Sequence, residues 1–152
     1  MITPILYGLA VAILAANGEP FVEASHCGTL GCDWVIAVSH DGLVTVDTPL
    51  GAHRSTRYRL SSKEFGSFKL AVERERPTEL SGRIGDLAVD GPVREVRVNV
   101  GGHSGTFRLY TTPPGIGWTY RTDSGDVSRA IRVCEAVRAL GGGKLASCVD
   151  VR

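Results

Sequence analysis

The chain has 152 residues, of which 43% are hydrophobic and 22% charged, and its 17 basic and 16 acidic side chains leave a formal net charge of +1. A chain of this length and apolar content can bury one hydrophobic core, so we expect a single domain. The near-zero net charge argues against a nucleic-acid-binding protein and against a highly charged disordered chain.

The N-terminal segment carries no charged side chain over residues 2–16. Its apolar run from Ile5 has the length of the core of a secretory signal peptide and is shorter than the roughly 20 apolar residues of a membrane-spanning helix. Small residues permit cleavage after Gly18 or after Ala16. We therefore predict a signal peptide over residues 1–18, a mature domain over residues 19–152, a periplasmic or secreted location and no stable membrane span. The alternative is that the segment stays as an N-terminal anchor.

Four cysteines, an even number, are typical of an exported protein in an oxidising compartment, and they allow three pairings. Cys27 and Cys32 enclose a short segment with two glycines, which permits the tight reversal that a local disulfide needs. Cys134 and Cys148 would join a helix to the terminal segment. Of the three pairings we favour this one, with two disulfides.

A zinc site is the alternative for the first pair, because His26, Cys27, Cys32 and Asp33 are neighbours and all are possible zinc ligands. Structural zinc sites usually repeat a closely spaced cysteine pair, whereas the other two cysteines are 14 residues apart and have no histidine beside them. We therefore predict disulfides, and neither a metal nor another cofactor.

The first predicted element is a β-hairpin over residues 34–48, where apolar and polar residues alternate on both sides of a turn at residues 40–42. A three-residue turn pairs Ile36 with Val46 and keeps the apolar side chains of both arms on one face, which a two-residue turn would not do.

A strand and a helix are expected next. The strand places Arg57 and Arg59 on one face, opposite its apolar side. Ser61 and Glu64 have the spacing of a capping box, so we expect a helix that begins there and ends before Pro77.

A second hairpin is predicted around a turn at residues 101–104. Pairing Val98 with Phe107 keeps its valines on the same face as the apolar residues of the second arm. This register sets Arg97 opposite Arg108.

The clearest helix covers residues 126–140, where apolar residues recur at helical spacing before a run of three glycines. Arg129, Arg132 and Glu135 fall on its opposite side, which we expect to face solvent. Strands and helices are mixed in this order without a regular alternation. The pattern favours an α+β fold, an antiparallel sheet with two helices packed on one face and disulfides holding the chain.

The histidines are candidate catalytic or metal-binding residues, and each lies in or beside a predicted turn: His26, His40, His53 and His103. Residues 39–41 read Ser-His-Asp, but neighbouring side chains on a strand point apart, whereas a catalytic triad assembles from distant segments. The chain has no phosphate-binding loop, zinc-protease motif or nucleophile elbow. We predict no catalytic residue, and a small hydrolase or metal-dependent enzyme using turn histidines remains the alternative.

The order of the charges is the most informative signal. Residues 17–53 contain five acidic and no basic side chains, a charge of −5, whereas residues 54–152 contain 17 basic and 11 acidic ones, a charge of +6. Like charges that face each other across a sheet are unfavourable, so Arg97 and Arg108 need relief from Glu95, another acidic group or a ligand.

We therefore hypothesise a non-enzymatic exported binding or accessory protein, whose partner is a protein or an anionic envelope component. Arginine suits the recognition of carboxylate or phosphate groups. The proposed binding residues are Arg57, Arg59, Arg97, Arg108 and His103. Two alternatives stay open, a solvated sheet face neutralised by the acidic N-terminal half, and a structural subunit held at a membrane by its N-terminal segment.

Overall fold

The computed structural model describes residues 18–85, 92–110 and 124–149. The predicted signal peptide, apart from its last residue, lies outside these residues.

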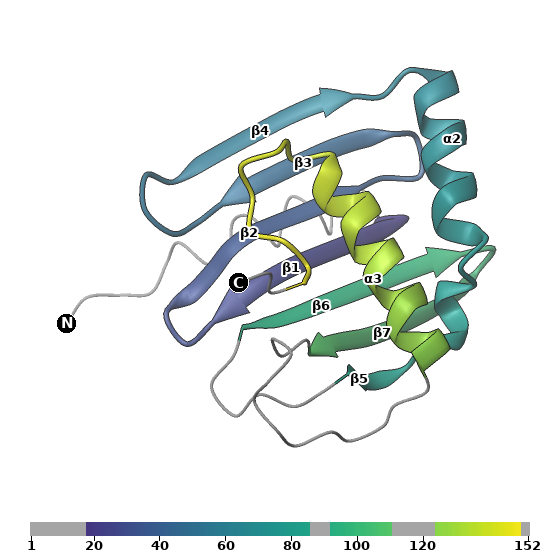
Figure 1. Ribbon diagram of the computed structural model, residues 1–152. Helices are drawn as coiled ribbons and strands as arrows, with labels where there is room; N and C mark the ends of the chain where they lie inside the picture. Colours follow the sequence, from purple (N-terminus) through teal and green to yellow (C-terminus); the bar gives the residue numbers. More distant parts are fainter. Residues whose placement is uncertain (1–17, 86–91, 111–123, 150–152) are drawn as a thin grey trace.

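Seven strands form one sheet (Figure 1), in the order β4-β3-β2-β1-β6-β7-β5. The strands are β1 (Val22–Gly28), β2 (Gly31–Val38), β3 (Leu43–Thr48), β4 (Arg54–Arg59), β5 (Gly82–Gly85), β6 (Val93–Val100) and β7 (His103–Tyr110). Every neighbouring pair is antiparallel except β5 and β7, which run parallel. The expected α+β class with a mainly antiparallel sheet is confirmed.

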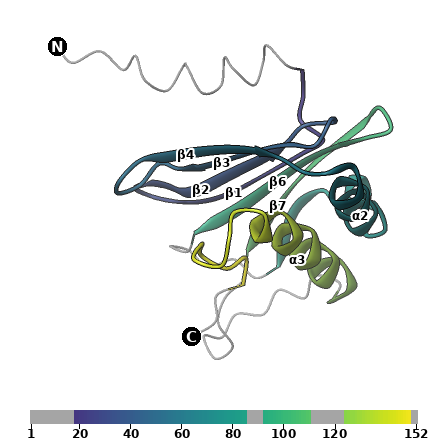
Figure 2. The same ribbon diagram turned by 90° about the horizontal axis from the view of Figure 1, so that it is seen from above.

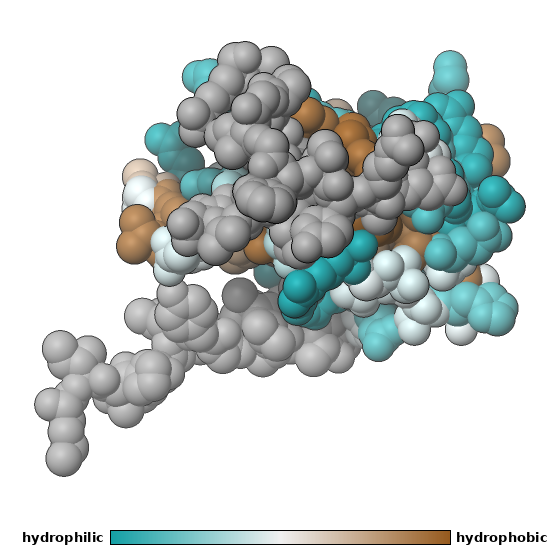
Figure 3. All heavy atoms as spheres, turned by 60° about the horizontal axis from the view of Figure 1, so that its bottom comes forward, coloured by the Kyte–Doolittle hydropathy of each residue, from teal (hydrophilic) through white to brown (hydrophobic). Residues whose placement is uncertain are grey.

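Two α-helices accompany the sheet, α2 (Ser62–Glu73) and α3 (Ser124–Ala139), with a short 3-10 helix η1 (Pro77–Glu79) after α2. The capping box that begins α2 is confirmed, since the Glu64 amide donates to Ser61 Oγ at 3.2 Å and the Ser61 amide donates to Glu64 Oε2 at 2.8 Å. Figure 3 shows hydrophilic residues over the end of the molecule that carries α2.

Helix α3 lies along one face of the sheet, and α2 runs past the strand ends beside it (Figures 1 and 2). The core consists of the sheet side chains that point toward α3, the buried side of α3 itself, and Phe68 and Val72 of α2. The burial of β1 alternates strictly along the strand, as a sheet with one covered face requires. Trp34, fully buried on this face, donates from Nε1 to the Ala146 carbonyl at 3.0 Å and so holds the C-terminal segment against the sheet.

The first predicted hairpin has the register that its apolar residues indicated. Ile36 lies opposite Val46, and Val38 lies opposite Val44. All four side chains are buried, so the requirement to keep them on one face fixed the pairing correctly.

The register predicted for the second hairpin is wrong by two residues. Val98 lies opposite Gly105, and Val96 lies opposite Phe107. The turn consists of Gly101 and Gly102 alone, with φ of 58° and 78°, which is the geometry of a two-residue hairpin turn that matches the twist of the strands. A shift of two residues keeps every side chain on its face, so the apolar pattern could not exclude the longer turn.

We expected the polar side of α3 to face solvent, and the structure corrects this, because its polar side chains contact other segments of the chain. Arg132 donates from Nε and Nη2 to the carboxylate of Glu75 at 2.8 and 2.9 Å, and Arg129 donates to the Glu75 carbonyl at 2.8 Å. Glu135 accepts from the Cys148 amide at 2.7 Å. The periodicity located the apolar side of the helix but could not show that polar segments pack on the other side.

Both favoured disulfides are present, Cys27–Cys32 at the end of the β1–β2 hairpin and Cys134–Cys148 between α3 and the C-terminal segment. None of the four cysteines is free. The zinc alternative at residues 26–33 therefore lacks its two thiolate ligands.

Replacing both Cys134 and Cys148 by alanine should lower the free energy of unfolding by about 3 kcal/mol, the chain-entropy value for a loop of this length. The matched Cys27→Ala and Cys32→Ala double variant opens a shorter loop and should lose about 2 kcal/mol. Urea unfolding of the three proteins measures both differences. A larger loss from the shorter loop would contradict this account.

Candidate functional site

The sheet face that points away from α3 carries the candidate site. Strand side chains alternate between faces, so the neighbours of core residues on each strand lie on this second face. On the neighbouring strands β1, β6 and β7 it presents a mixture of charged, hydroxyl and aromatic side chains. We call this whole side of the sheet the polar face. On these three strands it carries Glu23, Ser25 and Cys27 of β1, Glu95 and Arg97 of β6, and Arg108 and Tyr110 of β7.

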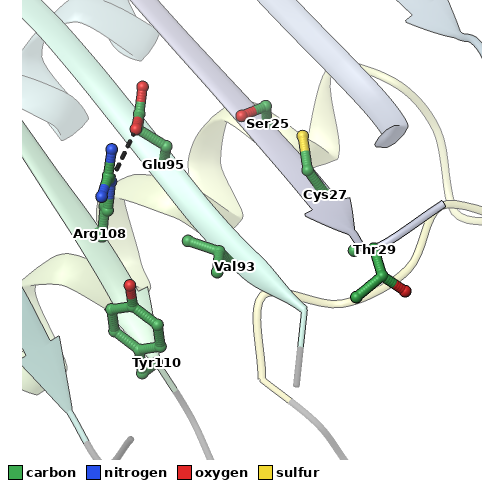
Figure 4. A pocket seen from close by; sticks show the side chains of 8 residues that line it. Ser25, Cys27, Thr29, Val93, Glu95, Arg108 and Tyr110 are labelled. Carbon is green, nitrogen blue, oxygen red and sulfur yellow. Dashed lines mark hydrogen bonds and ion pairs between the residues drawn. The ribbon is translucent and has the colours of Figure 1, made fainter. Parts of the chain in front are cut away.

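One carboxylate on the polar face binds two arginines. Arg97 donates to Glu95 Oε1 from Nε at 2.8 Å and lies 2.7 Å from it through Nη2. Arg108, directly opposite Glu95 across the β6–β7 pair, donates from Nε to Oε2 at 2.9 Å (Figure 4). The sequence allowed Glu95, another acidic group or a ligand to neutralise Arg97 and Arg108. In the structure, Glu95 does so.

Electrostatics keeps Glu95 ionised. Its partial burial on its own would raise the pKa, but the hydrogen bonds from Arg108 and Arg97 outweigh that effect and hold the pKa below its usual value. Glu23 lies opposite Arg97 on β1, and its pKa is raised because burial outweighs the attraction of Arg97. Glu23, Arg97, Glu95 and Arg108 thus place charges of alternating sign across three neighbouring strands.

An open groove of about 420 Å³ adjoins this ion-pair network, and we call it the Arg108 groove. In Figure 4, Arg108 and Tyr110 come from β7, Val93 and Glu95 from β6, and Ser25 and Cys27 from β1. The lining residues are Ser25, Cys27, Gly28, Thr29, Val93, Glu95, Arg108 and Tyr110. The groove therefore combines a guanidinium and the carboxylate that it binds with an aromatic ring, apolar atoms and the hydroxyls of Ser25, Thr29 and Tyr110.

The five residues proposed from the sequence do not form one site. Arg97 and Arg108 lie together, and His103 is exposed at the turn end of β7. Arg57 and Arg59 are on β4, four strand positions from β6, which at about 4.8 Å for each step is roughly 19 Å.

The four histidines are also separated. His26 is buried in β1 and its Nδ1 lies 2.8 Å from Asp33 Oδ2, whereas the exposed His40, His53 and His103 lie in the β2–β3 turn, directly before β4 and at the start of β7. The structure thus brings no two of them together as a catalytic or metal-binding pair would require.

The Ser-His-Asp run at residues 39–41 forms a turn. Ser39 donates to Asp41 Oδ1 and accepts from the Leu43 amide at 2.9 Å, and Asp41 forms an ion pair with Arg59 at 2.8 Å. The hydrogen bond from Ser39, with the contribution of Arg59, lowers the pKa of Asp41 to about 2. Both side chains therefore stabilise the β2–β3 turn and its contact with β4.

Sequence reasoning missed Ser25, Val93 and Tyr110 as members of the groove. The signal that could have located Tyr110 is the Gly101-Gly102 pair, because a two-residue turn places Arg108 beside Glu95 and Tyr110 beyond it on the same face. No pattern in the sequence shows that β1 pairs with β6, so Ser25 had no signal.

No protein-family model matches the chain, and a search of curated proteins finds no significant match. Within residues 18–85, 92–110 and 124–149, no helix is both long and apolar enough to cross a membrane. Those residues also contain no cluster of three or more His, Cys, Asp and Glu side chains that could hold a metal ion.

Replacing Glu95 by glutamine should lower the free energy of unfolding by about 1 kcal/mol, because Arg97 and Arg108, diagonal neighbours on one face, would then lose the carboxylate that they share. The pKa of Glu95 is depressed in the folded state, so its contribution is present above the usual glutamate value and is lost as the pH falls below it. Thermal melts of wild type and Glu95→Gln should therefore differ at pH 7 and converge below pH ~4. A difference that stays constant with pH would contradict the role of the ionised carboxylate.

Proposed function

We propose that the protein is an exported, non-enzymatic binding protein whose polar face takes an acidic side chain of a partner protein in the Arg108 groove. In this proposal both helices pack on the opposite face of the sheet, so the polar face is accessible to the partner. The observation that carries it is the sharing of one carboxylate by two arginines, beside an open groove.

The donors of the two guanidinium groups exceed what Glu95 can satisfy. A guanidinium has five N–H donors, and Arg108 directs Nε to Glu95 and also forms a hydrogen bond with the side chain of Tyr110. The side chain of Arg108 is 53% exposed, and that of Arg97 is 63% exposed. A second carboxylate can therefore bind the outer side of Arg108 without displacing Glu95.

The other walls of the groove suit a protein ligand. Tyr110 and Val93 offer apolar surface next to the charge, and Ser25 offers a hydroxyl. Tyrosine and arginine together are typical of the residues that contribute most to protein–protein binding. This composition favours an acidic side chain within a polypeptide over a small inorganic ion.

The proposed export rests on the two disulfides, which persist in oxidising compartments, and on the apolar N-terminal segment of the sequence. The separation of the four histidines favours a binding role over the hydrolase or metal-enzyme alternative.

A short peptide, acetyl-Pro-Glu-Pro-amide, tests the groove, because its prolines prevent it from pairing as a strand. At millimolar concentration it should shift the amide NMR signals of residues 25–29, 93–95 and 108–110 in the wild-type protein. Arg108→Gln should weaken binding about tenfold, the effect of losing a charge-assisted contact.

Two controls accompany this titration. The peptide with Gln in place of Glu should not bind, and Lys63→Gln, which removes an exposed charge on α2, should leave the affinity unchanged. Equal shifts with both peptides would refute carboxylate recognition. Shifts with inorganic phosphate but not with the Glu peptide would instead assign the groove to an anionic envelope component.

Export has its own test, the intact mass of the protein recovered from the periplasm or medium. We expect the mass of residues 19–152, or of the chain cut after Ala16, less the four hydrogens lost in forming two disulfides. Recovery with Met1 still present would contradict the signal peptide and favour the membrane-held subunit.

A further inference from the structure

We propose that the outer edge of β4 is a docking site that binds an extended acidic segment of a partner protein by adding it to the sheet as an eighth strand. This site lies apart from the Arg108 groove and does not depend on the function proposed for it.

Strand β4 is the end of the sheet and is accessible along its whole length. It is first in the strand order, with β3 on its inner side, and all six of its residues are exposed (Figure 1). The opposite edge is formed by the four-residue strand β5. Strand β4 is therefore the longer of the two sheet edges.

The hydrogen bonds to β3 determine which backbone groups of β4 point outward. The amide of Leu60 donates to the Gly42 carbonyl at 3.0 Å, and the Arg54 carbonyl accepts from Thr48 Oγ1 at 3.4 Å, so even-numbered residues point their backbone groups toward β3. Alternate residues of a strand point these groups in opposite directions. Ser55, Arg57 and Arg59 consequently present their N–H and C=O groups at the outer edge.

The charges along this edge select an acidic ligand. Arg57 and Arg59 lie on the polar face, and Arg54 lies on the other face. Arg59 is 55% exposed and forms an ion pair with Asp41 at 2.8 Å. In the part of the chain that the structure describes, Arg54 and Arg57 have no ion-pair partner. Arg57 is thus available for a carboxylate of an added strand, and Arg59, which bonds Asp41 through Nη1 and stays half-exposed, has further N–H donors for a second one.

A second copy of this chain is a poor occupant. Antiparallel pairing of β4 with another β4 must set odd-numbered residues opposite odd-numbered ones, which places Arg57 opposite Arg57 in one register and Arg57 opposite Arg59 in the next. Like charges directly opposite each other destabilise a strand pair, and charged edges are a common protection against self-association. Charge complementarity therefore points to a different protein with acidic residues.

The register also specifies the pattern of that segment. Residues opposite Arg57 and Arg59 lie on the polar face, so acidic residues at positions i and i+2 face the two guanidinium groups. The residue between them lies on the face of Tyr58, which is 37% exposed and donates its hydroxyl to the Leu140 carbonyl. An apolar side chain at that position can pack against the Tyr58 ring, and the segment reads Glu-apolar-Glu.

Amide hydrogen exchange with the peptide acetyl-Thr-Glu-Val-Glu-Val-Glu-Thr-amide tests this docking mode. Binding should slow exchange at the outward amides of Ser55, Arg57 and Arg59, with little change at the inward amides of Thr56 and Tyr58. Protection confined to residues 25–29 and 108–110, or no protection at all, would overturn the proposal.

Substitutions distinguish the contribution of the backbone hydrogen bonds to binding from that of the arginine charges. Combining Arg57→Gln with Arg59→Gln should weaken binding about five- to tenfold, the sum of two exposed charge pairs, and the peptide with Gln in place of Glu should weaken by as much. Arg57→Pro removes an outward donor that β3 does not use and should abolish protection at Ser55 and Arg59. The control, Arg83→Gln on β5, should bind as wild type does. Equal affinity for the Glu and Gln peptides would refute the proposed selectivity, leaving the arginines as protection against aggregation.

Discussion

The two-residue turn at Gly101 and Gly102 is the constraint on which the polar face depends. Because both glycines adopt positive φ, β6 and β7 pair immediately on either side of the turn, and Arg108 comes opposite Glu95. A turn longer by two residues would set Arg108 opposite Arg97 and move Glu95 away from the charge that it neutralises. The geometry of two glycines thus decides whether this face carries an ion-pair network or a repulsive pair.

The acidic N-terminal part and the basic remainder of the chain meet at a few places in the fold, whereas most arginine–carboxylate pairs form within the basic part. Asp41 pairs with Arg59, and Glu23 lies opposite Arg97, because one sheet contains both halves and places β1 beside β6. Among the described residues, Arg54 and Arg57 have no ion-pair partner, and they lie on β4, the first strand of the sheet.

Local features of the fold could be predicted from the sequence, and features that depend on distant pairing could not. The capping box at Ser61 and the disulfide Cys27–Cys32 involve residues a few positions apart, so spacing alone identifies them. The first hairpin followed from the burial of its alternating residues. The second did not, because a slip of two residues preserves the same alternation. The contact between Arg132 and Glu75 joins segments that only the packing of α3 brings together.

The positive charge of the β4 arginines affects two kinds of strand pairing, with a second copy of this chain and with an acidic partner. An edge strand with free backbone groups can pair with any extended chain, and a row of positive charges prevents pairing with its own copies. The same charges lower the free energy of pairing with a strand whose carboxylates alternate in register with them. The position of Arg57 and Arg59 on one face of an unpaired strand therefore has both effects. It disfavours pairing with a second copy of this chain, and it favours pairing with an acidic strand of a partner.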